Sequence, residues 1–227
     1  MNKIYSLASV LFIILMTISC GTKKEQAEEK KPVQAPVSEP AAATNKKNIL
    51  FFGNSLTAGY GIEPSQAFPA LIQKKIDSLN LNYTVVNGGV SGETSSGGNG
   101  RIDWALRQPV DVFILELGGN DGLRGIAVQE TRKNLQEIID KVVAKNPQTK
   151  LILAGMQMPP SMGQDYIKEF RNLYPELASK NKMSFIPFLL EGVGGESELN
   201  QRDGIHPNEK GAIIVAENVW KILQPLL

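Results

Sequence analysis

Histidine, cysteine and excess charge are all scarce in this sequence. The chain has one histidine and one cysteine in 227 residues, and its formal net charge at pH 7 is +1. Because transition-metal sites are usually built from several histidine and cysteine ligands, we expect no metal site. The basic residues are scattered among the acidic ones, which argues against nucleic-acid binding. Glycine-rich stretches are present, but none has the lysine of a GK[ST] phosphate-binding loop.

The N-terminus carries an apolar run from Leu7 to Ile18. This run is short for a membrane-spanning helix and has the length of the apolar part of a signal peptide. The single cysteine, Cys20, follows it, and the segment resembles a bacterial lipoprotein signal, although Thr17 stands where that pattern prefers leucine. The resemblance implies that residues 1–20 form the signal, that Cys20 is lipidated, and that the protein is anchored in the bacterial cell envelope, facing the periplasm or the exterior. An uncleaved anchor and plain secretion are the alternatives.

Residues 21–47 contain no aromatic side chain and are dominated by Lys, Glu, Pro and Ala. Such a segment cannot bury enough apolar surface to offset its ordering entropy, so we expect a disordered tether that spans roughly 30 Å. The remaining residues, 48–227, are enough for one well-packed domain.

Within residues 48–227, short β-rich runs alternate with helical patterns. The expected strands are "NILFF" (48–52), "YTVVN" (83–87), "DVFILEL" (111–117), "KLILAG" (150–155) and "MSFIPF" (183–188). Most are apolar without strict alternation, as in strands covered on both faces. The alternation predicts a three-layer α/β/α sandwich with a parallel sheet and right-handed crossovers.

Three segments between or after these runs have helical periodicity: 127–145, 165–181 and 207–223. Their apolar stripes are Leu135, Ile138, Ile139, Val142 and Val143 in the first, Tyr166, Phe170, Leu173 and Leu177 in the second, and Ala212, Val215, Ala216, Val219, Ile222 and Leu223 in the third. Pro175 is expected to kink or divide the second helix.

Ligands of parallel α/β folds bind beyond the carboxyl ends of the strands, so the loops there are the place to look for chemistry. The only histidine, His206, lies in "RDGIHPNEKG", three residues after Asp203 and directly before Pro207. The Asp203 carboxylate can reach one ring nitrogen and leave the other free to act as a general base, while Pro207 favours an extended His206 and the first turn of a helix. The alternative is an ordinary loop histidine.

A nucleophile for such a base is present in "GNSLTAGYG", which follows the first strand. There Ser55 can project its hydroxyl into the crevice from a turn flanked by Gly53 and Gly59. Read alone, Ser55 could equally be a helix N-cap. Together with Asp203 and His206 it makes an acyl-transfer site the better interpretation.

Acyl transfer also needs hydrogen-bond donors for the oxyanion. Asn120 in "LGGND" follows the third strand, and Gly92 in "VSGETS" offers a backbone N–H without a side chain in the way. The expected oxyanion hole is Ser55, Gly92 and Asn120. Both loops could also be plain turns, because Asn, Gly and Asp are common in turns.

These segments resemble the GDSL/SGNH hydrolases, named for Ser, Gly, Asn and His in four blocks, which here are Ser55, Gly92, Asn120 and His206. The segments "LGGNDGLRG" and "DGIHPN" are similar to the corresponding motifs of one branch of this family, the multifunctional thioesterase/arylesterase/lysophospholipase type. The resemblance covers residues 48–227 and implies a flavodoxin-like five-stranded parallel sheet of order 2-1-3-4-5. The family usually has Asp before the nucleophile, whereas this chain has Asn54, a change expected to adjust the site without disabling it.

The resemblance implies a serine esterase that hydrolyses carboxylic esters or thioesters through an acyl-enzyme on Ser55 and needs no cofactor. The expected partners are a small acyl substrate and, through the lipid on Cys20, a membrane. The loops 156–166 and 188–198 could line an acyl groove or simply cap the sheet. Two other functions stay open: an esterase that removes O-acetyl groups from envelope polysaccharide, and a binding lipoprotein that has kept a relic site. The oligomeric state is not indicated.

Overall fold

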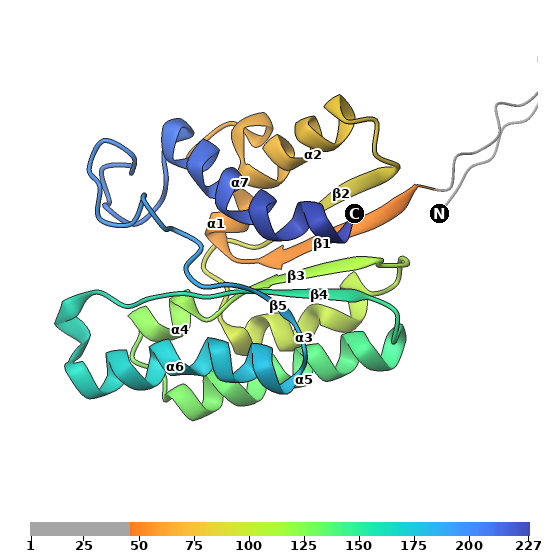
Figure 1. Cartoon of the computed structure of the whole chain (residues 1–227). Coiled ribbons are helices and arrows are strands. Elements are labelled where there is room, and N and C mark those ends of the chain that lie inside the picture. The colour runs from red at the N-terminus through yellow and green to blue at the C-terminus, as the bar shows by residue number, and fades with distance from the viewer. Residues whose placement is uncertain (1–45) are drawn as a thin grey trace, which may run out of the picture. The chain divides into compact units, whose positions relative to one another are not determined.

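The computed structural model describes residues 46–227, and both the predicted signal with Cys20 and almost all of the predicted tether lie outside them. The described residues form an α/β/α sandwich around one parallel sheet (Figure 1). Its strands are β1 (Lys47–Gly53), β2 (Tyr83–Gly89), β3 (Val112–Glu116), β4 (Lys150–Ala154) and β5 (Ser184–Ile186). The predicted five strands, their parallel pairing and the order β2-β1-β3-β4-β5 are confirmed.

Helices cover both faces of the sheet. The longer ones are α2 (Phe68–Ser78), α3 (Ser95–Ala105), α5 (Val128–Lys145), α6 (Gln164–Lys180) and α7 (Glu209–Leu223), and the short ones are α1 (Ser55–Ala58), α4 (Gly119–Leu123), η1 (Pro64–Gln66), η2 (Pro160–Met162) and η3 (Gln224–Leu226). Helices α2 and α7 pack together on one face, and α3, α5 and α6 cover the other (Figure 1). Among the described residues, no helix is both long and apolar enough to cross a membrane.

The central strands are buried because both faces are covered. All five residues of β3 and the last five of β1 are buried. The stripe predicted on α5 packs into this core except for Val143, which is 40% exposed because it lies just past the edge of the buried arc.

Three local predictions need correction. Of the two effects expected of Pro175, a kink or a division, division does not occur, because α6 runs on through it: the proline and the preceding turn at Arg171 are exposed, so the carbonyl that loses its N–H partner can bind water. Pro207 does not open α7, because Asn208 is the N-cap and accepts hydrogen bonds from the N–H groups of Lys210 and Gly211. Strand β1 starts at Lys47, one residue before the predicted domain start.

Helix α3 was not predicted, since its glycines disfavour a helix. Thr94 caps it by accepting a hydrogen bond from the N–H of Gly97. Gly98 faces the core, where an added Cβ would collide with Leu117 and crowd Phe52. Close packing on the sheet therefore outweighs the low helix propensity. Residues 95–100, which look like part of a glycine-rich loop in the sequence, are helical.

Candidate active site

Ser55 lies where strand β1 gives way to helix α1, at the carboxyl edge of the sheet. Asn54 caps the helix: its Oδ1 accepts a hydrogen bond of 2.9 Å from the N–H of Leu56. The helix ends after one turn because Gly59 adopts a left-handed conformation with φ 76°. Ser55 is thus held in a tight strand–turn–helix, with 8% of the residue exposed.

His206 meets Ser55 from a loop about 150 residues later in the chain. Its Nε2 lies 2.8 Å from Ser55 Oγ, and its Nδ1 lies 2.7 Å from Oδ2 of Asp203. The other carboxylate oxygen of Asp203 accepts hydrogen bonds from the backbone N–H groups of Ile205 and His206, so the turn holds the carboxylate under the ring. Gly204, with φ 69°, allows this tight turn. The structure thus brings together the serine, histidine and aspartate singled out in the sequence.

The hydrogen bonds also set the charge of Asp203. Partial removal from water acts to raise the pKa of this carboxyl, but the hydrogen bonds from the backbone and ring of His206 and from the N–H of Ile205 outweigh it and lower the pKa to about 2. Asp203 is therefore ionised throughout the pH range in which an imidazole changes its charge, and it orients the ring through Nδ1.

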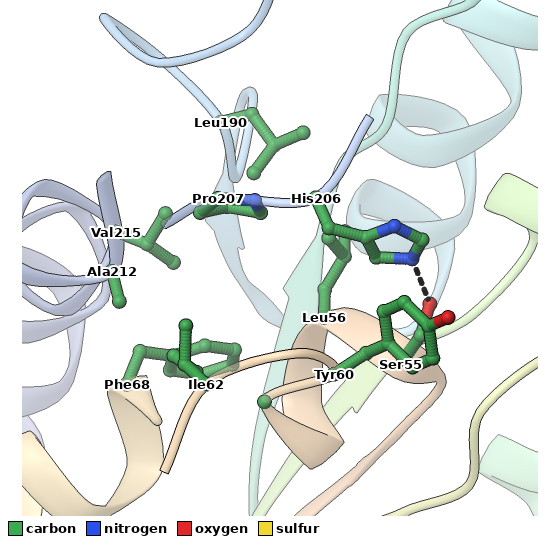
Figure 2. A pocket seen from close by; sticks show the side chains of 11 residues that line it. Ser55, Leu56, Tyr60, Ile62, Phe68, Leu190, His206, Pro207, Ala212 and Val215 are labelled. Carbon is green, nitrogen blue, oxygen red and sulfur yellow. Dashed lines mark hydrogen bonds between the residues drawn. The ribbon is translucent and has the colours of Figure 1, made fainter. Parts of the chain in front are cut away.

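Tyr60 packs against the imidazole, a contact that sequence reasoning missed. The two ring centres are 4.7 Å apart at an angle of 45°, and Figure 2 shows the tyrosine beside both His206 and Ser55. Gln201 ties the two loops together: its Nε2 donates to the carbonyl of Tyr60 at 2.6 Å, and its backbone N–H donates to the carbonyl of His206 at 2.7 Å. Sequence patterns carry no signal for this contact, because its partners are far apart in the chain.

Asn120 and Gly92 lie on two neighbouring loops that are joined through Glu93. The Nδ2 group of Asn120 donates a hydrogen bond of 2.9 Å to the Glu93 carbonyl. Gly92 has φ 78°, a backbone conformation that favours glycine, and its carbonyl accepts a hydrogen bond from Arg124. The Asn120 amide is therefore fixed in orientation while its second Nδ2 hydrogen is not used by this bond.

Arg101 also supports this loop, a role that no sequence motif indicates. Its guanidinium forms an ion pair with Glu93, donates to the carbonyl of Gly88 at 2.8 Å, and lies 4.0 Å from the ring centre of Phe52. The Arg101 Nη2 is also 3.4 Å from the carbonyl of Gly53, directly before the Ser55 turn. One side chain thus joins the ends of β1 and β2 to the Gly92 loop.

A cleft of about 470 Å³ opens beside Ser55 and His206. One wall comes from residues 156–160 and another from the loop after β5, including Phe188 and Leu190. The two loops that could have formed an acyl groove or merely capped the sheet therefore both line a cleft at Ser55. In residues 46–227, no group of three or more His, Cys, Asp or Glu side chains is placed to hold a metal ion.

The model of one protein family, described as the GDSL-like lipase/acylhydrolase family, matches residues 51–213. The chain belongs to this family. The match includes Ser55, Gly92, Asn120, Asp203 and His206, so every residue of the candidate site lies within it. The family predicted from the sequence is confirmed.

Relatives within the GDSL-like family carry esterase names. The chain is 40% identical over 192 residues to "Esterase TesA" of Pseudomonas aeruginosa, covering 84% of this chain and 93% of that one. It is 38% identical over 180 residues to "Thioesterase 1/protease 1/lysophospholipase L1" of Escherichia coli K12, covering 79% and 84% of the two chains. Over 180 residues it is 32% identical to an "Arylesterase" of Vibrio mimicus, covering 79% of this chain and 89% of that one.

Solved structures of GDSL-like proteins have the same fold. The crystal structure of TesA aligns with a TM-score of 0.76 at 40% identity, covering 80% of this chain and all of that one. The SGNH-hydrolase family esterase AlinE4 aligns with a TM-score of 0.66 at 35% identity, covering 80% and 97%. The predicted fold class and enzyme class, an SGNH-type carboxylic ester hydrolase, are confirmed.

Proposed function

We propose that this GDSL-like enzyme hydrolyses carboxylic esters or thioesters with Ser55 as nucleophile, His206 as general base and Asp203 as the residue that orients the base. The observation that carries the assignment is the continuous hydrogen-bonded chain of Ser55 Oγ, the His206 ring and the Asp203 carboxylate, at 2.8 and 2.7 Å. Each residue stands in the relation that a Ser-His-Asp triad requires.

In the first half-reaction, Ser55 Oγ attacks the acyl carbon while its proton passes to Nε2 of His206. The tetrahedral intermediate collapses as His206 returns that proton to the leaving oxygen or sulfur, which departs as an alcohol or thiol. His206 then takes a proton from water, whose oxygen attacks the acyl-enzyme and releases the acid together with free Ser55. The proton balance closes within Ser55, His206 and water, so the reaction needs no cofactor.

We assign the oxyanion hole to the N–H groups of Ser55 and Gly92 and to Nδ2 of Asn120. The hydrogen bond from Asn120 to the Glu93 carbonyl supports this assignment, because it orients the amide before substrate binds. A donor fixed in advance costs no reorganisation when negative charge develops on the acyl oxygen.

Replacing Asn120 by Ala should lower kcat by roughly 10²- to 10³-fold, equivalent to about 3 to 4 kcal/mol, with little change in KM. The reason is that the amide binds the oxyanion of the transition state more strongly than the carbonyl of the substrate. Steady-state hydrolysis of an aryl ester measures both constants. Asn181→Ala, which removes an amide at the end of α6, is the control and should keep wild-type kinetics. A large rise in KM at constant kcat would make Asn120 a substrate-positioning residue instead.

The cleft supports acyl groups longer than acetyl. Met156, Met158 and Phe188 contribute apolar surface beside Ser55, where methylene groups of a chain can be buried. A series of aryl esters from acetyl to long-chain acyl tests this directly, and we expect kcat/KM to rise beyond the acetyl ester. Activity confined to acetyl esters would favour the alternative, a polysaccharide O-acetyl esterase.

We also propose that the mature protein is held in the bacterial cell envelope by lipid on Cys20, as the lipoprotein-like signal implies. A tether that joins the domain at Lys47 meets the start of β1, whereas Ser55 follows the other end of the same strand.

A Cys20→Ala protein should leave the membrane fraction or retain an unprocessed signal. Two or more long acyl chains hold a protein on a membrane where one is marginal, since each buried methylene contributes about 0.8 kcal/mol. Intact mass and membrane fractionation measure both outcomes, with Ser19→Ala as the matched control that keeps the cysteine. A wild-type chain that is unmodified and wholly in the soluble fraction would refute the anchoring, while the esterase assignment would stand.

A further inference from the structure

Glu116 is a fully buried carboxylate directly behind the turn that carries Ser55. It is the last residue of β3, pairs in register with Gly53 of β1, and is 1% exposed. Its Oε2 accepts hydrogen bonds from the backbone N–H of Asn54 at 3.1 Å and from the hydroxyl of Thr57 at 2.8 Å, and its Oε1 accepts one from Nδ2 of Asn54 at 2.7 Å. All three bonds come from Asn54 and Thr57, one residue before and two residues after Ser55.

The direction of the bond between Asn54 and Glu116 is fixed by the other end of the amide. Asn54 Oδ1 already accepts the N–H of Leu56 and lies 3.4 Å from Ser55 Oγ. If the amide were reversed, its NH₂ group would face the N–H of Leu56, donor against donor. Asn54 must therefore donate to Glu116, and Glu116 must accept.

No cation is among the hydrogen-bond partners that the structure gives Glu116 in residues 46–227. Burial raises the pKa of Glu116 to about 7, although the hydrogen bonds from Asn54 and Thr57 lower it. Tyr174 of α6 is a neighbouring acid whose own pKa is raised by burial and then by the charges of Glu116 and Asp121. The nearest cation of α3, Arg101, is paired with Glu93, and His206 reaches the turn through Ser55.

We propose that Asn54 and Glu116 are a positioning pair that holds Ser55 in its attacking geometry through hydrogen bonds of fixed direction, an inference that rests on the proposed role of Ser55. Glu116 is not among the residues that line the cleft, so it can act on the reaction only through its neighbours. The pair acts through the backbone, because Asn54 is bound to Glu116 by both its N–H and its amide and is adjacent to Ser55 in the chain.

The pair gives a physical reason for the departure from the family pattern. An aspartate at position 54 would put an oxygen against Oε1 of Glu116, so the two carboxyls would have to share a proton in a buried place. An amide supplies its own hydrogen, and the site needs no shared proton. Asn54 thus lets the turn stay intact when Glu116 is ionised.

The test exchanges the hydrogen-bond donor and acceptor between positions 54 and 116. In Glu116→Gln, the new NH₂ group opposes Nδ2 of Asn54, and we expect kcat to fall about ten- to hundredfold because a buried donor is left unpaired. In Asn54→Asp the two carboxyls share a proton, so activity should decline towards alkaline pH, where that proton is lost.

The double variant combines Asn54→Asp with Glu116→Gln. Its side-chain amide at position 116 can donate to the carboxylate at position 54, while the amide oxygen still accepts from the N–H of residue 54 and from Thr57. Most of the wild-type kcat should return, with the wild-type alkaline profile.

Rescue separates positioning from loss of structure. Thermal unfolding of each variant shows whether it folds, and Asn54→Asp is informative through its pH profile even if Glu116→Gln is not stable. Asn146→Asp is the matched control: it makes the same change where the amide donates to the carbonyl of Val110, and it should leave the profile of kcat/KM unchanged. Because the chain has one histidine, NMR titration of its ring protons gives the pKa of His206 itself, so an alkaline decline cannot be confused with it.

A folded double variant with kcat no better than the worse single variant, or an Asn54→Asp protein with an unchanged pH profile, would overturn the positioning pair. These outcomes are distinct from failure of the proposed function. If wild-type protein hydrolyses esters and Ser55→Ala does so equally well, the role of Ser55 fails first, and the pair has nothing to position.

Discussion

Ser55→Ala is expected to lower the kcat for aryl-ester hydrolysis by roughly 10⁶-fold, the size of effect seen when a triad nucleophile is removed. The reason is that the substitution removes the oxygen that lies 2.8 Å from His206 Nε2, so no acyl-enzyme can form at this position. Stopped or long-incubation assays of release of the aryl alcohol give the residual rate. The fold should survive, since the Ser55 hydroxyl is not part of the core.

Ser65→Ala is the matched control for this prediction, because Ser65 is an exposed serine in η1, within the segment that follows the Ser55 turn. It should hydrolyse aryl esters at the wild-type rate. Near-normal turnover by purified Ser55→Ala would show that Ser55 is not the nucleophile of a triad.

His206→Ala should reduce kcat about as strongly as Ser55→Ala, because the hydroxyl is a weak nucleophile without a base. Ser55 and His206 act as one unit, so the double variant should be hardly worse than either single variant. Parallel kcat measurements of the three proteins on one aryl ester test this non-additivity. Losses that multiply in the double variant would mean that the two side chains contribute independently, against the shared proton transfer.

The fold could be predicted from the sequence because its main signals are local. The apolar run 48–52 and the stripe with Leu135, Ile138 and Ile139 each identify one element with its buried face. Order and pairing of the strands came from the family resemblance. Helix α3 was missed because its stability depends on Gly98 packing against Phe52 and Leu117, side chains from distant parts of the chain that no local propensity records.

The residues of the candidate site also differ in whether a local sequence signal marks them. Ser55, Asn120 and His206 stand in short motifs and could be singled out from their spacing to a strand end or to Asp203. Glu116 could not: it lies in an apolar strand, and its meaning depends on Asn54, 62 residues earlier.

Arg101 and Gln201 escaped prediction for the same reason. Each makes a hydrogen bond to the backbone carbonyl of a segment far away in the sequence, Gly53 in one case and Tyr60 in the other. A carbonyl acceptor is common to every residue and leaves no trace in the sequence. Residues that hold a site are therefore harder to predict than residues that react in it.

Labelling of the wild-type protein with a fluorophosphonate, followed by intact mass and peptide mapping, shows whether Ser55 is the activated nucleophile. The reagent phosphonylates a serine only where a base has activated it and an oxyanion hole accepts the phosphonyl oxygen. We predict one adduct per chain, on Ser55, together with loss of esterase activity, and no adduct on Ser55→Ala. If the wild-type protein hydrolyses esters yet remains unlabelled at Ser55, or is inactivated by an adduct at another residue, Ser55 is not the nucleophile.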